Sequence, residues 1–297
     1  MRAVSRRLVQ HAHALAREIS ARAVVVNADA IEADEDLRQL LRTVDYRTIL
    51  ISRSVPAAVA TDDGRRMWVV VPNVRMTRTG QVKVAVLICL AKGILDHGDR
   101  VVCLSGIDGS GIIDMLMVLN LGSEAELFTS SDALNLCGSV NPEVFERVLT
   151  LSSQLAVEGR EGRPVGGIFV VGDSDHVLAQ SRSLILNPFH GYSEDDRNIL
   201  DPRMEETLKQ FSAIDGAFVV RDDGVVLGAG VHLTPTAQGA TLPNGLGTRH
   251  AAAAAITAST NAVAVAISES TGMVSVFRAG QMVADIHKPS NGLKEPT

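Results

Sequence analysis

Aromatic residues are scarce in this chain of 297 residues, where seven Phe, two Tyr and one Trp make up 3% of the sequence. So few rings leave few platforms on which single-stranded nucleic acid could stack. The chain also has no excess of basic residues: 28 Lys and Arg stand against 34 Asp and Glu, which gives a net charge of −6. Proteins that bind nucleic acid generally carry a basic face. We therefore expect no nucleic-acid partner, while a few local Arg residues could still bind a small anion.

Cysteine is scarce, and long apolar runs are absent. Cys89, Cys103 and Cys137 are an odd number at wide spacing, without a CxxC pair, so neither a zinc site nor a disulfide framework is expected. No run of 18 or more apolar residues occurs, so we expect no membrane-spanning helix and no membrane partner. The basic segment 1–20 has apolar residues at helical spacing and predicts an amphipathic helix, not a leader peptide. Together these features favour a cytoplasmic protein with reduced thiols.

The first half of the chain alternates β-branched and helical segments. Apolar residues make up 46% of the sequence, enough for packed cores, and the length suits two domains. The alternation predicts an α/β domain with a mainly parallel sheet, which we place at residues 1–138. We expect strands at 23–26, 48–52, 67–71 and 101–105, and helices at 35–44, 81–96 (with His97-Gly98 as the C-cap) and 112–119.

The second half has a different pattern and predicts an α+β domain over residues 139–287, with a mixed central sheet flanked by helices. Asn141 as N-cap and Pro142 at the first helical position begin a helix that runs to residue 158. The segment 288–297 is a turn-rich tail that we expect to fray. We expect strands at 168–171, 217–220, 225–233, 263–268 and 273–278, a helix at 250–258, and hairpin turns at 221–224 and 271–272.

One glycine-containing segment precedes an alanine-rich helix: Gly245-Leu246-Gly247-Thr248-Arg249-His250. Thr248 suits the N-cap, which puts two potential cations, Arg249 and His250, at the positive end of the helix dipole. An anion on the helix start would resolve this conflict, with glycine backbone, free N–H groups and Arg249 converging on phosphate. The alternative is a solvated Arg beside a core His.

Two further segments place polar residues at the ends of predicted strands. Asp215 and Gly216 precede the strand 217–220; they are either a turn with positive φ at Gly216 or a carboxylate directed into a cleft. Ser268 and Glu269 follow the strand 263–268, where Glu269 either helps to hold a cation or faces water. All three segments lie in one predicted domain. Phosphate-binding donors beside carboxylates suit phosphoryl or nucleotidyl transfer, which depends on positioning and charge neutralisation.

These residues resemble a known family. Asp215-Gly216-Ala217, followed by Gly247-Thr248-Arg249-His250, is similar to the DGA and RHR motif pair of diadenylate cyclase domains (DAC, DisA_N). Residues 166–173, 227–235 and 264–270 also look like segments of that family. The resemblance covers roughly residues 141–285, and the two motifs occur in order, about 30 residues apart.

The resemblance implies a nucleotidyltransferase that condenses two ATP into cyclic di-AMP, with two domains face to face and therefore self-association. It implies Mn²⁺ or Mg²⁺ as the metal, which fits hard oxygen ligands. Its implied catalytic residues are Asp215, Arg249 and His250, with Asp215 and Glu269 as metal ligands. Its implied ATP-binding residues are Gly216, Ala217, Leu233, Gly247, Thr248, Arg249, His250, Ser268 and Glu269.

The sequence departs from the family at Ala251, where the motif usually has a second Arg. The loss of this cation leaves three interpretations open: weaker ATP affinity, another Arg in its place, or a nucleotide-binding sensor without catalysis. Residues 72–121 more loosely resemble the C-terminal domain of pyruvate kinases, an α/β domain that soluble archaeal-type diadenylate cyclases place before the DAC domain. We expect it to serve oligomerisation or regulation. A different phosphate-handling enzyme in this half is the last alternative, because Asp108 and Asp114 form no convincing catalytic arrangement.

Overall fold

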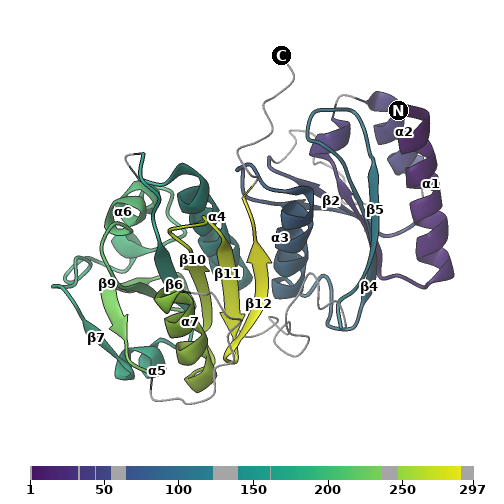
Figure 1. Cartoon of the computed structure of the whole chain (residues 1–297). Helices are drawn as coiled ribbons and strands as arrows, with labels where there is room; N and C mark the ends of the chain where they lie inside the picture. The colour runs from purple at the N-terminus through teal and green to yellow at the C-terminus, as the bar shows by residue number, and fades with distance from the viewer. Residues whose placement is uncertain are drawn as a thin grey trace.

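The computed structural model describes residues 2–32, 34–43, 45–54, 65–122, 140–160, 162–235 and 247–288. Within these residues the chain forms two sheets, and one helix, α3 (Arg78–Ala91), lies between them (Figure 1). The predicted boundary at residues 138/139, Cys137 and residues 289–297 of the predicted tail lie outside the described residues. No helix in the described part of the chain is both long and apolar enough to cross a membrane.

The first sheet is built from residues of the N-terminal half. Its elements are α1 (Arg2–Glu18), β1 (Ala23–Asn27), the 3-10 helix η1 (Asp29–Ile31), α2 (Glu35–Thr43), β2 (Thr48–Ser52), β3 (Arg66–Val70), α3, β4 (Arg100–Ser105) and β5 (Met115–Asn120). The strand order is β3-β2-β1-β4-β5, with β5 antiparallel to β4 and the other neighbours parallel. Because side chains alternate along a strand, Val24 and Val26 pack with α1 and α2, while Ala23 and Val25 pack on the α3 side.

Two predictions in this half are wrong. The segment predicted as a helix at 112–119 forms β5, an edge strand along β4; a short apolar run does not distinguish a helix from a strand, and pairing decided. The predicted helix 81–96 ends at Ala91, well before Gly98. Gly93 has φ +65°, its N–H bonds Leu90 O at 3.2 Å, and Ile94 N–H bonds Cys89 O at 2.9 Å. These two bonds form a Schellman motif, which ends the helix just before Gly93.

The second sheet is mixed and belongs to the C-terminal half. Its elements are α4 (Pro142–Glu158), β6 (Gly167–Val171), α5 (Ser174–Ala179), β7 (Ser181–Ser183), the 3-10 helix η3 (Asp195–Arg197), α6 (Met204–Phe211), β8 (Ala217–Val220), β9 (Val226–Leu233), α7 (Thr248–Ser259), β10 (Val263–Ile267), β11 (Val274–Arg278) and β12 (Gln281–Ile286). The order is β12-β11-β10-β6-β8-β9-β7, and of the described pairs only β6 and β8 run parallel. Helix α7 packs on one face of this sheet and α4 on the other.

Local signals placed several elements of this half correctly. Asn141 is the N-cap of α4 and its side chain accepts from Glu143 N–H at 3.0 Å, with Pro142 at the first helical position, as predicted. The hairpin turns at 221–224 and 271–272 are confirmed by their backbone hydrogen bonds. The strand β12 was not predicted. Its partners are β11 in the sheet and α3 of the other half.

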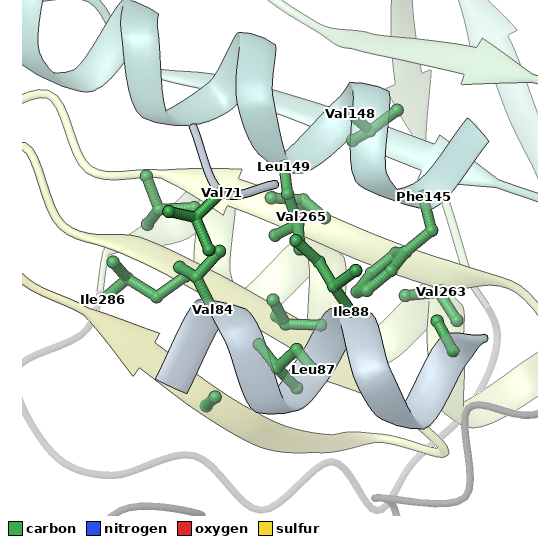
Figure 2. Close-up of a cluster of buried hydrophobic side chains, with 14 of the residues drawn as sticks. Val71, Val84, Leu87, Ile88, Phe145, Val148, Leu149, Val263, Val265 and Ile286 are labelled. Atoms are coloured by element: carbon green, nitrogen blue, oxygen red, sulfur yellow. The ribbon is translucent and has the colours of Figure 1, made fainter. Parts of the chain in front are cut away.

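The two halves share one apolar core. Val84, Leu87 and Ile88 of α3 face Phe145 and other residues of α4, β10 and β12, as Figure 2 shows. Leu87 and Ile88 are at most 1% exposed, and each such side chain contributes about 2 kcal/mol by leaving water. Since α3 is apolar on nearly all sides, it is the core helix of both halves and not a surface helix of either.

Candidate active site

The sheet topology brings three predicted segments to one edge of the second sheet. Ala217 of β8 is in register with Ile168 of the parallel β6. Ile267 of the antiparallel β10 is in register with Gly167. The residues before β8 (Asp215 and Gly216) and those after β10 (Ser268 and Glu269) therefore meet at the edge where β6 begins.

Helix α7 begins at this edge. Its N-cap is Gly247 and not Thr248, so that prediction is wrong by one residue; Gly247 O accepts from His250 N–H at 3.1 Å and Ala251 N–H at 3.2 Å. Glycine serves as an N-cap because the position needs extended backbone, and it offers no side-chain acceptor. Thr248 is the exposed first residue of the helix, and Arg249 and His250 stand in the first turn, as predicted. Gly245 and Leu246 lie outside the described residues.

Arg249 connects α7 to both strand ends. Its Nη1 lies 2.9 Å from Glu269 Oε2, and its Nη2 lies 3.4 Å from Asp215 Oδ1. The Asp215 side chain is 90% exposed and that of Glu269 57% exposed, against 33% for Arg249. The two carboxylates are thus open to solvent and to a ligand, with the guanidinium held between them. They also oppose the unfavourable placement of a cation at a helix N-terminus.

His250 does not act as a second cation of this helix start. Its side chain is buried, and its ring lies edge-on to Phe277 with centroids 5.9 Å apart. Burial, and to a lesser degree the charge of Arg249, lower the pKa of His250, so the imidazole is neutral at pH 7. Its Nε2 has no hydrogen-bond partner among the described residues. The surroundings of His250 are therefore those of the alternative interpretation, a histidine in the core. Its contact with phosphate stays a prediction.

Gly216 fits closely against the neighbouring strand. Its φ is +113°, which confirms the predicted positive φ, and a Cβ there would lie 2.6 Å from the carbonyl carbon of Gly230. A side chain at this position is excluded by both conformation and space. Ala217 and Leu233 follow on β8 and β9, both buried in the apolar cluster beneath the site edge.

Ser268 and Glu269 belong to the turn between β10 and β11. Ser268 N–H bonds Met273 O at 2.9 Å, and Ser268 O accepts from Gly272 N–H at 2.8 Å, which holds the turn. The Ser268 hydroxyl lies 3.3 Å from that of Ser270. Because the turn closes on itself through its backbone, the Glu269 side chain stays free to reach Arg249.

The donor set at the site suits a hard divalent cation in part. The described residues contain no group of three or more His, Cys, Asp or Glu that could hold a metal ion by itself. Asp215 and Glu269 supply two exposed carboxylates on either side of one guanidinium. Mg²⁺ commonly binds through one or two carboxylates and takes its remaining oxygens from substrate phosphates and water. The residues present fit such a shared site.

Sequence reasoning missed Gly166 as a member of the site. This buried glycine precedes β6 and lies directly under the Arg249 guanidinium. The local signal is the glycine pair Gly166-Gly167 before an apolar strand, since glycine beside or within a strand often marks a bulge, a bend or the close approach of another group.

Comparisons with known proteins find one family match in each half of the chain. Residues 154–282 match the family described as DisA bacterial checkpoint controller nucleotide-binding, and residues 5–129 match the family described as probable sensor domain DacZ_P. The second match concerns the half for which we noted a looser resemblance to pyruvate kinases, which stays a prediction.

Solved structures of similar proteins include two bacterial ones. One is a hypothetical membrane spanning protein from Bacillus cereus, which is 20% identical. The match covers 52% of this chain and 70% of that protein's chain, with a TM-score of 0.39. DacA from Staphylococcus aureus, a double-mutant structure, is 21% identical over 48% of this chain and 87% of its own, with a TM-score of 0.32.

Two curated relatives are more similar in sequence. A diadenylate cyclase from Methanocaldococcus jannaschii is 36% identical over 199 residues, which cover 67% of this chain and 63% of the relative. A diadenylate cyclase from Haloferax volcanii is 37% identical over 204 residues, covering 66% of this chain and 71% of the relative. With this identity, and with the DisA-type nucleotide-binding match over the half that carries Asp215 and Arg249, the chain belongs to the diadenylate cyclase family.

Proposed function

We propose that this protein condenses two ATP molecules into cyclic di-AMP and releases two pyrophosphates. The observation that carries the proposal is the position of Arg249, at the N-terminus of α7 and within reach of carboxylates from two other elements. A cation, a helix start and two exposed carboxylates at one sheet edge can bind a triphosphate and orient a hydroxyl beside it.

In the proposed reaction the 3′-hydroxyl of each ATP attacks the α-phosphorus of the other. A new P–O bond forms, the bond to the β-phosphate oxygen breaks, and pyrophosphate leaves with the electron pair. Asp215 directs the attacking hydroxyl and accepts its proton as the new bond forms. The Arg249 guanidinium and the backbone N–H groups of Thr248 and Arg249, at the start of α7, face the phosphates, where negative charge accumulates.

The remaining site residues have proposed roles in holding the nucleotide. Gly216, Ala217 and Leu233 border the nucleoside, and at Gly216 no side chain stands between a ligand and the backbone. Gly247 allows a phosphate to approach the helix start, and Ser268 lies at the phosphate edge. Asp215 and Glu269 would hold Mn²⁺ or Mg²⁺, which when bound neutralises charge on the phosphates.

The symmetry of the product requires two copies of the domain. In this scheme each DAC domain binds one ATP, and the two ATP molecules react with each other. Two DAC domains must therefore face each other across a two-fold axis. We therefore propose self-association of at least two chains, with the exposed edge that carries Asp215 and Glu269 turned toward the partner.

The test is to incubate the purified chain at high concentration with ATP and either Mn²⁺ or Mg²⁺, and to identify products by mass. Cyclic di-AMP and pyrophosphate in a 1:2 ratio are the expected products. Nucleotide binding by calorimetry without any product would instead support the sensor alternative that Ala251 raises. Absence of product with both metals would overturn the proposed catalysis.

A further inference from the structure

We propose that Gly166 is a positioning residue, whose bare backbone seats the Arg249 guanidinium between Asp215 and Glu269. The consequence for catalysis rests on the proposed function, while the seat itself is a property of this chain. Gly166 comes directly before β6, at the edge where the three site segments meet.

The contact involves the guanidinium as a whole. A Cβ built on Gly166 would lie 2.5 Å from Arg249 Nη1, 2.7 Å from Cζ and 3.1 Å from Nε. Three atoms of one planar group cannot all be this near unless the group lies against the Gly166 backbone. Any side chain at residue 166 would occupy the space that the guanidinium fills.

Backbone conformation does not explain the glycine. Neither Gly166 nor its neighbour Gly167 has a positive φ. A Cβ on Gly167 would meet only Ile267 Cδ1, at an ordinary 3.7 Å. The two glycines are therefore adjacent in sequence and different in surroundings, and only at residue 166 does a functional side chain take the place of a Cβ.

Displacing the guanidinium would affect the site more than the fold. The guanidinium is the end of the flexible, partly exposed Arg249 side chain, so it can move aside at little cost in folding free energy. In moving, it would leave its positions 2.9 Å from Glu269 and 3.4 Å from Asp215. The two carboxylates would then lose their shared cation, and a phosphate would lose a preplaced one.

The experiment compares Gly166→Ala with the matched control Gly167→Ala, using cyclic di-AMP formation and thermal unfolding. We expect kcat/KM to fall about ten- to a hundredfold in Gly166→Ala, the range for one charge-assisted contact, with an unchanged Tm. Gly167→Ala should keep both near wild type. In an Arg249→Lys background, Gly166→Ala should cause no further loss; additive losses would overturn the proposal.

A second readout is independent of activity. The Nε–H resonance of Arg249 in an ¹H–¹⁵N spectrum, assigned by its loss in Arg249→Lys, reports the surroundings of the guanidinium. We expect it to shift in Gly166→Ala and to stay in place in Gly167→Ala. An unshifted resonance in Gly166→Ala would overturn the proposal that Gly166 positions the guanidinium. If wild type makes no cyclic di-AMP, the proposed function fails, and this resonance still decides whether Gly166 positions Arg249.

Discussion

Arg249 lies at a helix N-terminus, where the helix dipole disfavours a cation. Carboxylates from two distant segments, Asp215 and Glu269, pair with it and offset this effect. Both carboxylates are largely exposed, so these pairs add little to stability, and their value lies in the geometry they maintain. Asp215 in particular is 90% exposed, so replacing it should leave the fold intact.

The first prediction concerns Asp215. Asp215→Asn keeps the size of the side chain and removes its charge and its capacity to accept the hydroxyl proton, so cyclic di-AMP formation should fall at least about a hundredfold. The Tm should stay within about 2 °C of wild type. The control is Asp222→Asn, an exposed Asp in the hairpin at the opposite end of β8. A wild-type rate in Asp215→Asn would remove Asp215 from the mechanism.

The second prediction concerns His250 and pH. Burial lowers the pKa of His250 in the folded chain, so between that pKa and the ordinary value near 6.5 the unfolded chain binds more protons. Stability therefore rises with pH in this window and falls as pH drops below about 6.5. Urea unfolding at pH 7.5 and 5.5 should show a loss in wild type that is smaller in His250→Gln. The exposed control His11→Gln should keep the wild-type loss; an equal loss in His250→Gln would contradict the assignment.

At the scale of elements, helix ends decide where site residues stand. The N-cap of α7 is one residue earlier than Thr248, the predicted cap, and α3 ends at Ala91 because a Schellman motif forms at Gly93. α4, which packs on the face of the second sheet opposite α7, begins with the Asn141 cap. These ends are local features, so their energies can be measured one at a time.

The third prediction tests the cap of α4. Asn141→Ala removes the acceptor for Glu143 N–H, which should lower the free energy of unfolding by about 1 kcal/mol. Asn141→Asp keeps an acceptor and should lose less than half as much. Urea denaturation measures both, and an Asn141→Ala variant as stable as Asn141→Asp would show that the side-chain cap contributes nothing.

At the scale of the whole molecule, an ion pair and a shared core join the two halves. Lys83 of α3 donates to the Asp285 carboxylate at 2.5 Å and to Asp285 O at 3.0 Å, across 202 positions in sequence. Burial raises the pKa of Asp285, but the hydrogen bond and charge of Lys83, with a smaller effect of His287, outweigh it and hold that pKa below its usual value. Because this pair and the apolar cluster of Figure 2 both join the two halves, we expect the halves to unfold together.

The fourth prediction follows from this pair. Lys83→Met leaves the partly buried Asp285 carboxylate without its cation and should lower the free energy of unfolding by about 2 kcal/mol. Unfolding should stay a single transition, because both halves share the core. Adding Asp285→Asn should restore part of the loss. Arg38→Met, which breaks an exposed pair with Glu35, should cost under about 0.5 kcal/mol. Two separate transitions, or no loss in Lys83→Met, would refute the coupling.

Much of the fold could be predicted because its signals are local. The strand at 48–52, the Asn141-Pro142 helix start and the turn at 221–224 depend on residues that are neighbours in sequence. β5 and β12 could not be placed in this way, since each is a strand only because a partner strand lies beside it.

The same division holds for the candidate site. The sequence by itself determined which residues are present and in what order, from Asp215-Gly216-Ala217 to Arg249, and with them the family. Only the tertiary structure decided that Glu269 and Asp215 pair with Arg249, that His250 is buried, and that Gly166 lies under the guanidinium. Each of these is a contact between segments far apart in the chain, which exists only after the strands β6, β8 and β10 have paired.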